Sequence, residues 1–232
     1  MTEAVRTALI IGASRGLGLA LCAEYLKRGW NVIGTVRGVA HTGLHDLQAG
    51  ACGRLEIEVV DINEPNQVIA LRQRLDGTRA DVLFVNAGVS NGPKEVVAGV
   101  STEEFNRVMM TNALSPMRVV EALQDLVPPT GTIAAMSSGL GSVANNLAGG
   151  WEVYRASKAA QNTLMRSFAA RHAGDPRSLV VIAPGWVRTD MGGPQATLGI
   201  EDSIPRVVDV LEAHLGQPGL RYLDYQGNTL PW

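Results

Sequence analysis

The chain has 232 residues, of which 46% are hydrophobic and 18% are charged, and its 20 basic and 22 acidic residues give a net charge of −2. This composition is typical of one globular domain spanning residues 1–232, and the charge balance gives no general attraction for nucleic acid. The N-terminus is too short and polar for a signal peptide, and no apolar run reaches the length of a membrane span. Cys22 and Cys52 lie in no metal-ligand spacing. We therefore expect a soluble cytoplasmic protein without a metal site and without nucleic-acid or membrane partners.

Short apolar runs alternate along the chain with segments of helical periodicity. The runs cover Ala8–Ile11, Val32–Thr35, Leu55–Val60, Val82–Val85, Thr132–Met136 and Leu179–Ala183. Helical spacing is present in Leu17–Lys27, Gln67–Leu75, Ser101–Leu126 and Ala156–Arg171. The composition of 38–50 indicates a loop or frayed helix, and that of 139–150 indicates a long irregular loop. Strands that are apolar on both faces belong to a parallel sheet with helices on each side. The sequence therefore predicts a single-domain α/β protein with a Rossmann-type, doubly wound parallel sheet of about seven strands.

The first predicted strand ends in a glycine-rich turn that leads directly into the first helical segment. The residues of this turn that we expect at a binding site are Gly12, Ser14, Arg15, Gly16, Leu17 and Gly18. The first glycine allows a tight turn, the second lets backbone approach a pyrophosphate, and the third allows close packing of helix and strand. The positive end of the helix would then face the anion. This placement favours a dinucleotide-binding site, and the alternative is an ordinary tight turn.

The second strand leads into Arg37, at a position that decides between two dinucleotides. NAD is normally held there by a carboxylate on its ribose, whereas the 2′-phosphate of NADP needs a cation. No acidic residue is available, and the Arg37 guanidinium can bind phosphate through two parallel hydrogen bonds. Arg15 could reach the same phosphate from the glycine-rich turn. These residues predict NADP(H) as the cofactor in preference to NAD(H), and the alternative is that both arginines are simply solvated.

Tyr154 and Lys158 are four residues apart at the start of a predicted helix, so both side chains would lie on one face. A free tyrosine has a pKa near 10 and is a poor acid-base catalyst at neutral pH. A neighbouring ammonium favours the phenolate and lowers that pKa. The pair therefore predicts a proton donor or acceptor, and the alternative is a surface helix with one aromatic residue packed inward.

Other polar residues follow the predicted strands or lie in nearby helices. Ser137 and Ser138 come directly after the strand Thr132–Met136, so their hydroxyls would lie at the carboxyl edge of the sheet, where ligands bind. Either serine is a candidate for contact with a substrate. Asn112 lies inside a predicted helix, where it would either serve this site or bond its own backbone.

In chain order these features resemble the short-chain dehydrogenase/reductase family. The resemblance covers nearly the whole chain and is carried by the glycine spacing, the serine pair followed by Gly141, and the Tyr-x-x-x-Lys pattern. Two departures are present. Ile11 stands where the family usually carries Thr, and the interval between Ser138 and Tyr154 is a few residues longer than is common. The longer interval indicates an insertion in the loop 145–150.

The resemblance implies roles for the remaining motifs. Ser138 would polarise a substrate carbonyl, and Asn112 would anchor a water that links Lys158 to solvent. Tyr154 and Lys158 would also contact the cofactor, with Lys158 gripping the nicotinamide ribose. Asp61 and Ile62 would meet the adenine, although capping a turn is an equally good role for Asp61. The remaining cofactor contacts would come from two turns, namely from Asn86, Ala87 and Gly88 after the fourth strand and from Pro184, Gly185, Val187 and Thr189 after the sixth.

A closer likeness concerns the segments 154–158, 185–193 and 230–232, which resemble the C-factor and Sniffer group of carbonyl reductases. It implies hydride transfer between NADP(H) and a small-molecule carbonyl or alcohol, with Tyr154 as proton donor and acceptor. It also implies a homodimer, with a tetramer as the alternative. The substrate pocket would be lined by 139–150, Trp151, Trp186 and Met191–Leu198. Two other functions remain open: NADP(H) binding without turnover in a regulatory protein, and dehydration or epimerisation on the same scaffold.

Overall fold

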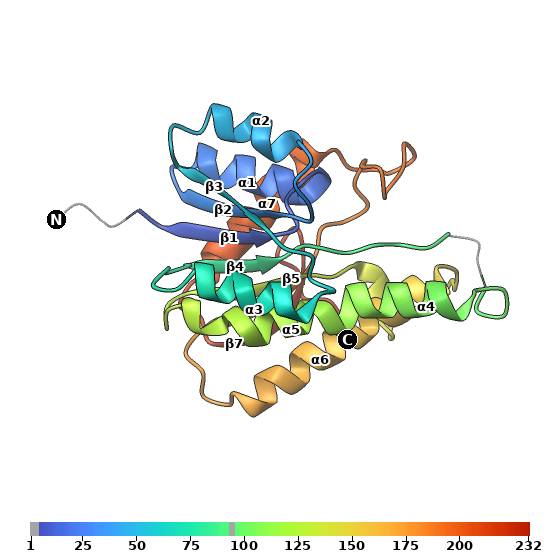
Figure 1. The fold of residues 1–232 in the computed structure, drawn as a ribbon. Helices are drawn as coiled ribbons and strands as arrows, with labels where there is room; N and C mark the ends of the chain where they lie inside the picture. Colours follow the sequence, from blue (N-terminus) through green and yellow to red (C-terminus); the bar gives the residue numbers. More distant parts are fainter. Residues whose placement is uncertain (1–4, 93–95) are drawn as a thin grey trace.

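The fold is built on one sheet of seven strands in the order β3-β2-β1-β4-β5-β6-β7 (Figure 1). The computed structural model describes residues 5–92 and 96–232. All adjacent strands pair in parallel. The strands are β1 Thr7–Ile11, β2 Asn31–Val36, β3 Leu55–Val59, β4 Val82–Val85, β5 Thr132–Met136, β6 Ser178–Ala183 and β7 Gly219–Asp224. The predicted doubly wound parallel sheet is confirmed.

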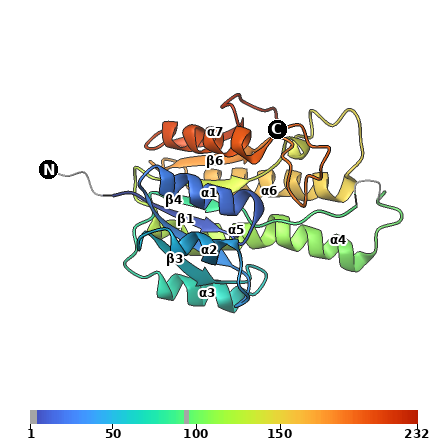
Figure 2. The ribbon, with the colours of Figure 1, turned by 90° about the horizontal axis from the view of Figure 1, so that it is seen from above.

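Helices cover both faces of the sheet (Figures 1 and 2). One face carries α1 Gly16–Lys27, α2 Gly43–Ala49 and α7 Ile200–Ala213. The other carries α3 Pro65–Arg74, α5 Ser115–Leu123 and α6 Glu152–Arg171, while α4 Thr102–Met109 extends beyond the sheet. Three short turns complete the list: the π-helical η1 Met110–Leu114 and the 3₁₀ turns η2 Gln124–Leu126 and η3 Gly139–Gly141. No helix within these described ranges is both long and apolar enough to cross a membrane.

The apolar runs fill two cores, one on each side of the sheet. In β1, Ala8 and Ile10 join the cluster under α1 and α7, whereas Leu9 and Ile11 join the cluster under α3, α5 and α6. All four side chains are fully buried. Successive side chains of a strand point to opposite faces, so a strand covered on both sides is apolar at every position. This explains why the runs show no alternation of polar and apolar residues.

The order of the strands reverses at β1 and β4, because β2 and β3 lie on one side of this pair and β5 to β7 lie on the other. In open α/β sheets such a reversal leaves a crevice at the carboxyl ends of the strands, since the adjacent connections leave toward opposite faces. The glycine-rich turn follows β1, and the Ser137-Ser138 pair follows β5. The fold therefore places the predicted motifs along one edge of the sheet.

Several elements differ from the sequence prediction. The predicted helix 101–126 is divided by η1, which contains one turn of π-helix. The segment 38–50, expected to be a loop or frayed helix, contains the short helix α2. The elements β7 and α7 were not assigned to particular residues. β7 lies at the edge of the sheet and carries Arg221 and Asp224, so it lacks the continuous apolar run of the central strands.

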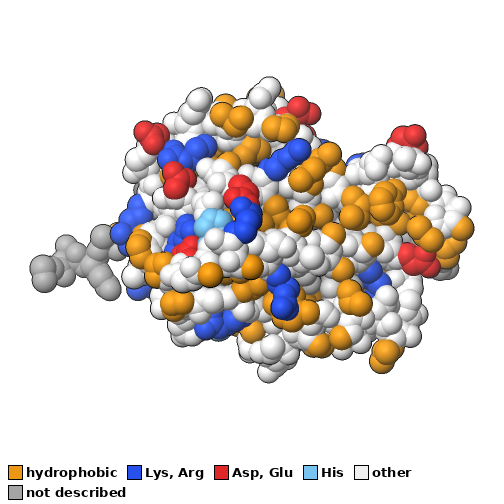
Figure 3. Space-filling view, turned by 90° about the horizontal axis from the view of Figure 1, so that it is seen from below, with side chains coloured by type: hydrophobic (Ala, Val, Ile, Leu, Met, Phe, Trp, Pro, Cys, Tyr) orange, Lys and Arg blue, Asp and Glu red, His pale blue; other side chains and the backbone are white. Residues whose placement is uncertain are grey.

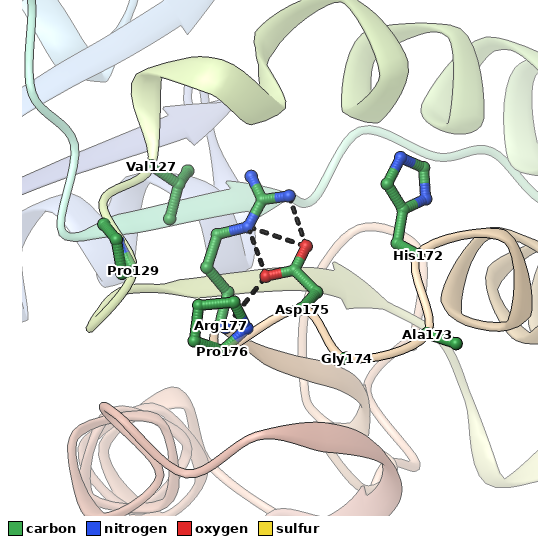
Figure 4. Close-up of a pocket in the computed structure, with 8 residues that line it drawn as sticks. All are labelled: Val127, Pro129, His172, Ala173, Gly174, Asp175, Pro176 and Arg177. Atoms are coloured by element: carbon green, nitrogen blue, oxygen red, sulfur yellow. Dashed lines mark hydrogen bonds and ion pairs between the residues drawn. The ribbon is translucent and has the colours of Figure 1, made fainter.

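A shallow pocket is present on the opposite side of the molecule from this edge. It is lined by Val127, Pro129, His172, Ala173, Gly174, Asp175, Pro176 and Arg177, in the segments that precede β5 and β6 (Figure 4). The Arg177 guanidinium is already engaged, because it pairs with the Asp175 carboxylate and donates to the Gln124 carbonyl oxygen. The predicted site residues lie at the carboxyl edge instead.

Candidate active site

The turn between β1 and α1 is tightly packed on one side and open on the other. Gly12 has φ +88°, and a Cβ there would lie 2.8 Å from Ala87. A Cβ at Gly18 would lie 2.0 Å from the Gly12 carbonyl oxygen, whereas the nearest described atom to a Cβ at Gly16 is Cγ2 of Thr189, at 4.0 Å. α1 begins without a side-chain cap and without an acidic residue in its first turn. Its N–H groups are therefore accessible to an anion, as a bound pyrophosphate requires.

A hydroxyl from the neighbouring strand helps to fix this turn. The Gly12 N–H donates to Oγ1 of Thr35 at 2.9 Å, and Nδ2 of Asn86 donates to the Gly12 carbonyl oxygen at 2.7 Å. Thr35 is almost fully buried at the end of β2. The sequence analysis did not identify Thr35, although a Thr in an otherwise apolar strand was a usable signal. Asn86, which was identified, supports the turn from β4.

The two arginines predicted to bind phosphate follow adjacent strands. Arg37 is exposed directly after β2. Arg15 pairs with Asp190 at 2.8 Å, and both side chains are 78% exposed. Asp190 lies in the segment after β6, so this ion pair joins that segment to the start of α1. An ion pair with this exposure contributes about 1 kcal/mol at most, so a phosphate can compete with Asp190 for Arg15.

At the end of β3, Asp61 caps a turn, which is the alternative role considered for it in the sequence. Its Oδ1 accepts the Asn63 N–H at 2.9 Å, and Ile62 is buried in the core. Asn63 in turn donates to the Thr111 hydroxyl at 3.1 Å and accepts from the Ser115 hydroxyl at 2.8 Å. These bonds tie the end of β3 to η1. A contact of Asp61 or Ile62 with adenine stays a prediction.

The structure separates the two serines that follow β5. Ser137 is buried, and its hydroxyl donates to Oδ1 of Asn162 at 2.7 Å. The Ser138 hydroxyl accepts the Leu140 N–H at 3.1 Å, and an interaction with the Ser138 side chain lowers the pKa of Tyr154. Ser138 is therefore the serine that meets Tyr154, whereas Ser137 joins β5 to α6.

Three successive residues with positive φ precede α6. The φ angles are +66° at Gly149, +67° at Gly150 and +53° at Trp151. A left-handed conformation costs a bulky residue about 1–3 kcal/mol. The Trp151 ring centre lies 6.0 Å from that of Tyr154 in an edge-on arrangement. The turn thus packs an aromatic ring against the catalytic candidate at the start of its helix.

Tyr154 and Lys158 lie on the same side of α6, as their spacing predicts, and Nζ of Lys158 is 6.0 Å from the centre of the Tyr154 ring. This amine is almost completely buried. Nζ donates to the Met136 carbonyl oxygen at 2.9 Å and to Oε1 of Gln161 at 3.1 Å. Burial disfavours the charged amine and lowers the pKa of Lys158 to about 7.

The pKa of Tyr154 differs from the sequence prediction in direction. We expected Lys158 to lower it, but burial raises the pKa of Tyr154 to about 12. The Ser138 side chain opposes this rise, and the nearby Tyr222 adds to it. The Lys158 amine does not offset burial, because it is directed to Met136 and Gln161 and its own charge is disfavoured. Tyr154 is therefore protonated at neutral pH in this structure.

Asn112 lies in η1 and is fully buried. Its Nδ2 donates to the Val89 carbonyl oxygen at 2.7 Å and to the Ser157 hydroxyl at 2.9 Å, and its Oδ1 accepts the Val89 N–H at 2.8 Å. A Cβ at Gly88 would lie 3.3 Å from this Oδ1 and 3.5 Å from Nζ of Lys158. The side chain thus bonds the chain after β4 instead of its own backbone. Oδ1 of Asn112 and Nζ of Lys158 therefore both lie close to Gly88. A water between them stays a prediction.

The turn after β6 closes over the start of α1. Gly185 has φ +82°, and Val187 pairs with Leu198 across the segment that follows. The Gly192 N–H donates to the Thr189 hydroxyl at 3.1 Å. Since Thr189 is also the nearest neighbour of Gly16, the turns after β1 and β6 border the same opening.

The segment ending at Trp232 folds back over the loop that carries Ser138. The Trp232 carbonyl oxygen accepts the Ala144 N–H at 3.1 Å and the Ser142 hydroxyl at 3.4 Å. Its ring packs on Tyr222, with ring centres 5.2 Å apart. The Tyr222 hydroxyl donates to the Ser138 carbonyl oxygen. The sequence analysis missed Tyr222, because its contact with this loop depends on how β7 pairs with the sheet.

The histidines near α2 have local partners. His41 pairs with Asp46 at 2.7 Å and stacks on His45, whose Nδ1 accepts the Thr42 N–H at 3.1 Å. Throughout residues 5–92 and 96–232, no group of three His, Cys, Asp or Glu side chains is placed to hold a metal ion.

Comparison with known proteins identifies relatives of this fold and site. A putative short-chain dehydrogenase/reductase from Burkholderia multivorans, solved with bound NADP, is 56% identical, with 98% of this chain and 100% of that chain covered and a TM-score of 0.97. A carbonyl reductase from Pseudomonas aeruginosa PAO1, solved in complex with NADP, is 37% identical over 99% of this chain and 100% of that chain, with a TM-score of 0.92. The C-signal protein of Myxococcus xanthus is 38% identical over 154 residues, which are 66% of this chain and 92% of that protein.

The family model described as short chain dehydrogenase matches residues 6–197, a range that includes the glycine-rich turn, Asn112, Ser138, Tyr154 and Lys158. These likenesses confirm the resemblance found in the sequence. The chain belongs to the short-chain dehydrogenase family.

Proposed function

We propose that this protein is an NADP(H)-dependent oxidoreductase that interconverts a small-molecule carbonyl compound and its alcohol, with Tyr154 as the proton donor and acceptor. The observation that carries the proposal is the placement of Ser138 beside Tyr154, with Lys158 one helical turn away on the same side of α6. All three residues lie at the sheet edge that bears the glycine-rich turn. The NADP-bound relatives support the choice of cofactor.

The residues at this edge fit the dinucleotide. The uncapped first turn of α1 offers N–H groups to a pyrophosphate, and the space at Gly16 is open. Arg15 and Arg37 would hold the 2′-phosphate, since both are exposed at the ends of adjacent strands and no acid stands at the end of β2. The remaining contacts are assigned to Ser14, Leu17, Gly88, Asp61, Ile62, Ala87, Pro184, Gly185, Val187 and Thr189.

When bound, the cofactor supplies the hydride for reduction. Tyr154 gives its proton to the substrate oxygen, and a pKa of about 12 keeps that proton in place at neutral pH until the oxygen becomes basic. The Ser138 hydroxyl hydrogen-bonds the same oxygen, and this bond strengthens as negative charge develops. Lys158 and Asn112 face the space beside Gly88, where they conduct the replacement proton toward Tyr154.

Tyr154→Phe tests this assignment. The variant removes one hydroxyl, so we expect kcat with a reactive aldehyde or quinone to fall by about 10²- to 10⁴-fold. The Kd for NADPH should change far less than kcat, as measured by fluorescence titration. Tyr25→Phe is the matched control, because the Tyr25 hydroxyl is buried in the core under α1 and has no hydrogen-bond partner among the described residues. Full turnover by Tyr154→Phe would contradict the mechanism.

The same assay separates the alternatives. A regulatory protein would bind NADPH and leave it unoxidised across a panel of carbonyl compounds. A dehydratase or epimerase would convert its substrate with no net consumption of the cofactor. We expect stoichiometric oxidation of NADPH instead. The proposed substrate pocket is lined by Trp151, Trp186 and the loop segments 139–150 and 191–198; Trp186 and Met191 are exposed there, which suits a partly apolar substrate.

We further propose that the protein forms a homodimer through the face made by α4, η1 and α6. Phe105, Met110, Leu114 and Leu164 on this face are large apolar side chains that are 37–39% exposed. The right-hand half of Figure 3, on the side where Figure 1 places α4, carries more hydrophobic than charged side chains. Analytical ultracentrifugation should give twice the chain mass, and Leu114→Glu should give the monomer. A monomeric wild-type protein would contradict this proposal.

A further inference from the structure

We propose that Gln161 is a positioning residue whose side-chain oxygen holds the Lys158 amine in its charged form on the side of α6 that carries Tyr154. The proposal rests on the proposed reductase function, because the charge on Lys158 matters to the reaction only there. Gln161 lies three residues after Lys158, so the two side chains are neighbours on the helix. Gln161 would thus act through Lys158 and would not touch the substrate.

The geometry gives Gln161 a specific partner. Its side chain is 1% exposed, and its Oε1 accepts a hydrogen bond from Nζ of Lys158 at 3.1 Å. A buried amide is costly unless it is hydrogen-bonded, so its presence between helix and sheet needs a compensating contact. The amine supplies it. Because an ammonium has three N–H donors, the bonds to Gln161 and to the Met136 carbonyl leave one donor for other partners.

Among its described contacts, the Lys158 amine meets neutral polar groups and no carboxylate. β5 contributes the Met136 carbonyl, η1 contributes the Asn112 side chain, and the chain after β4 contributes Gly88. The titratable groups nearby are Tyr154 on the same helix and, beyond it, Tyr222 of β7. With no carboxylate to hold the positive charge, each neutral acceptor has a large share in stabilising it.

The hydrogen bond from Lys158 to Gln161 matters because the pKa of Lys158 lies near neutral pH. Burial lowers the pKa of Lys158 to about 7, so the charged fraction changes steeply around neutral pH. Gln161 stabilises the protonated form, and removing it must therefore lower the pKa further. The amine would then become neutral at a lower pH. The rate of carbonyl reduction, whose replacement proton passes through the charged amine, would decline at correspondingly lower pH.

Two variants separate this role from simple packing. Gln161→Met keeps the length of the side chain and removes the acceptor, whereas Gln161→Glu keeps an acceptor and adds a negative charge. Thr163→Met is the matched control, because Thr163 is exposed on the same helix. The chain contains only Lys27, Lys94 and Lys158 as lysines, so the side-chain NMR signals of Lys158 can be identified with Lys158→Met.

The first measurement is a pH titration of those signals in the cofactor-free protein. We expect the midpoint for Lys158 to fall by about one pH unit in Gln161→Met, to rise by at least that much in Gln161→Glu, and to stay unchanged in Thr163→Met. The second measurement is the pH profile of kcat/KM. Its high-pH limb should move to lower pH in Gln161→Met and to higher pH in Gln161→Glu. If Gln161→Met fails to fold, the opposite shift in Gln161→Glu still decides the question.

An unchanged midpoint in the Gln161 variants, or an equal loss of activity at every pH, would overturn the proposal and leave Gln161 with a packing role. Failure of the reductase function is distinguishable from this result. In that case the wild-type protein would show no turnover, while the NMR titration would still report whether Gln161 governs the charge of Lys158.

Discussion

The two halves of the carboxyl edge are built in opposite ways. Around β1 and β2, binding depends on backbone N–H groups and on Arg15 and Arg37, which are exposed to solvent. Around β5 and α6, the polar side chains are buried and paired: Ser137 donates to Asn162, and Lys158 donates to Gln161 and to backbone. The first half needs little support from the core. In the second half, the residues of the site are themselves buried in the core.

This difference separates the consequences of mutation. A change to an exposed arginine should alter affinity and its dependence on salt, with little effect on stability. A change to a buried polar group should alter rate and stability together, because its partner is left without a hydrogen bond.

Ser138→Ala and Ser137→Ala test the buried half most strongly. Ser138→Ala removes the hydroxyl that meets Tyr154, so we expect kcat to fall by about 10²- to 10³-fold with a small loss of stability. Ser137→Ala leaves Oδ1 of Asn162 without its donor, so we expect unfolding to become about 1–3 kcal/mol easier while most of kcat remains. Steady-state kinetics and thermal unfolding of both variants measure these effects. A large loss of kcat in Ser137→Ala with little loss in Ser138→Ala would contradict the assignment.

Arg37→Ala tests the exposed half. Loss of its charge-assisted bonds should raise the KM for NADPH by about 10- to 100-fold while the KM for NADH stays the same. The Tm should not change, because Arg37 is exposed. Lys27→Ala is the control, since it removes a cation that is 77% exposed near the far end of α1. An equal effect on NADH and NADPH would rule out recognition of the 2′-phosphate by Arg37.

Trp232→Ala tests whether the loop after β5 must be held in place. The Trp232 ring packs on Tyr222 and lies 4.8 Å from the Arg166 guanidinium. Without it, the loop carrying Ser138 should become less ordered, and the KM for the carbonyl substrate should rise by about tenfold. The Kd for NADPH should stay the same. Trp232→Phe, which keeps an aromatic ring, should restore most of the affinity, and its failure to do so would count against this role.

Asp190→Asn should give the smallest effect. The change releases Arg15 from its ion pair, so the affinity for NADPH should increase by about two- to fivefold at low salt. The difference should disappear in about 1 M salt, where the pair is screened. Isothermal titration calorimetry at both salt concentrations would measure it. Weaker binding by Asp190→Asn would mean that Asp190 assists the cofactor and does not compete with it.

The central part of the fold could be predicted from the sequence because burial on both faces leaves an unambiguous pattern. The predicted strands Val82–Val85 and Thr132–Met136 coincide with β4 and β5. The positions of Gly12, Gly18 and Tyr154 at the edge followed from motifs whose spacing is fixed by local geometry. The placement of Tyr154 and Lys158 on one side of α6 followed from helical periodicity alone.

What could not be predicted depends on contacts between distant segments. Gln161 resembles any polar residue on a helix until the sheet buries it against Lys158. Tyr222 lies in an edge strand of mixed polarity, so neither the strand nor its contact with the Ser138 loop had a local signal. The raised pKa of Tyr154 is also a consequence of burial, which the i, i+4 spacing does not encode.

The π-helical turn at Met110–Leu114 limits which insertions and deletions this chain can accept. A π-turn accommodates one residue more than a regular turn, so deleting a single residue there would close it to ordinary helix and redirect the side chains of Met110–Leu114. Asn112 reaches Val89 and Ser157 only in the present phase of the helix. Loops elsewhere can change in length without such an effect. In this helix, the number of residues matters as much as their identity.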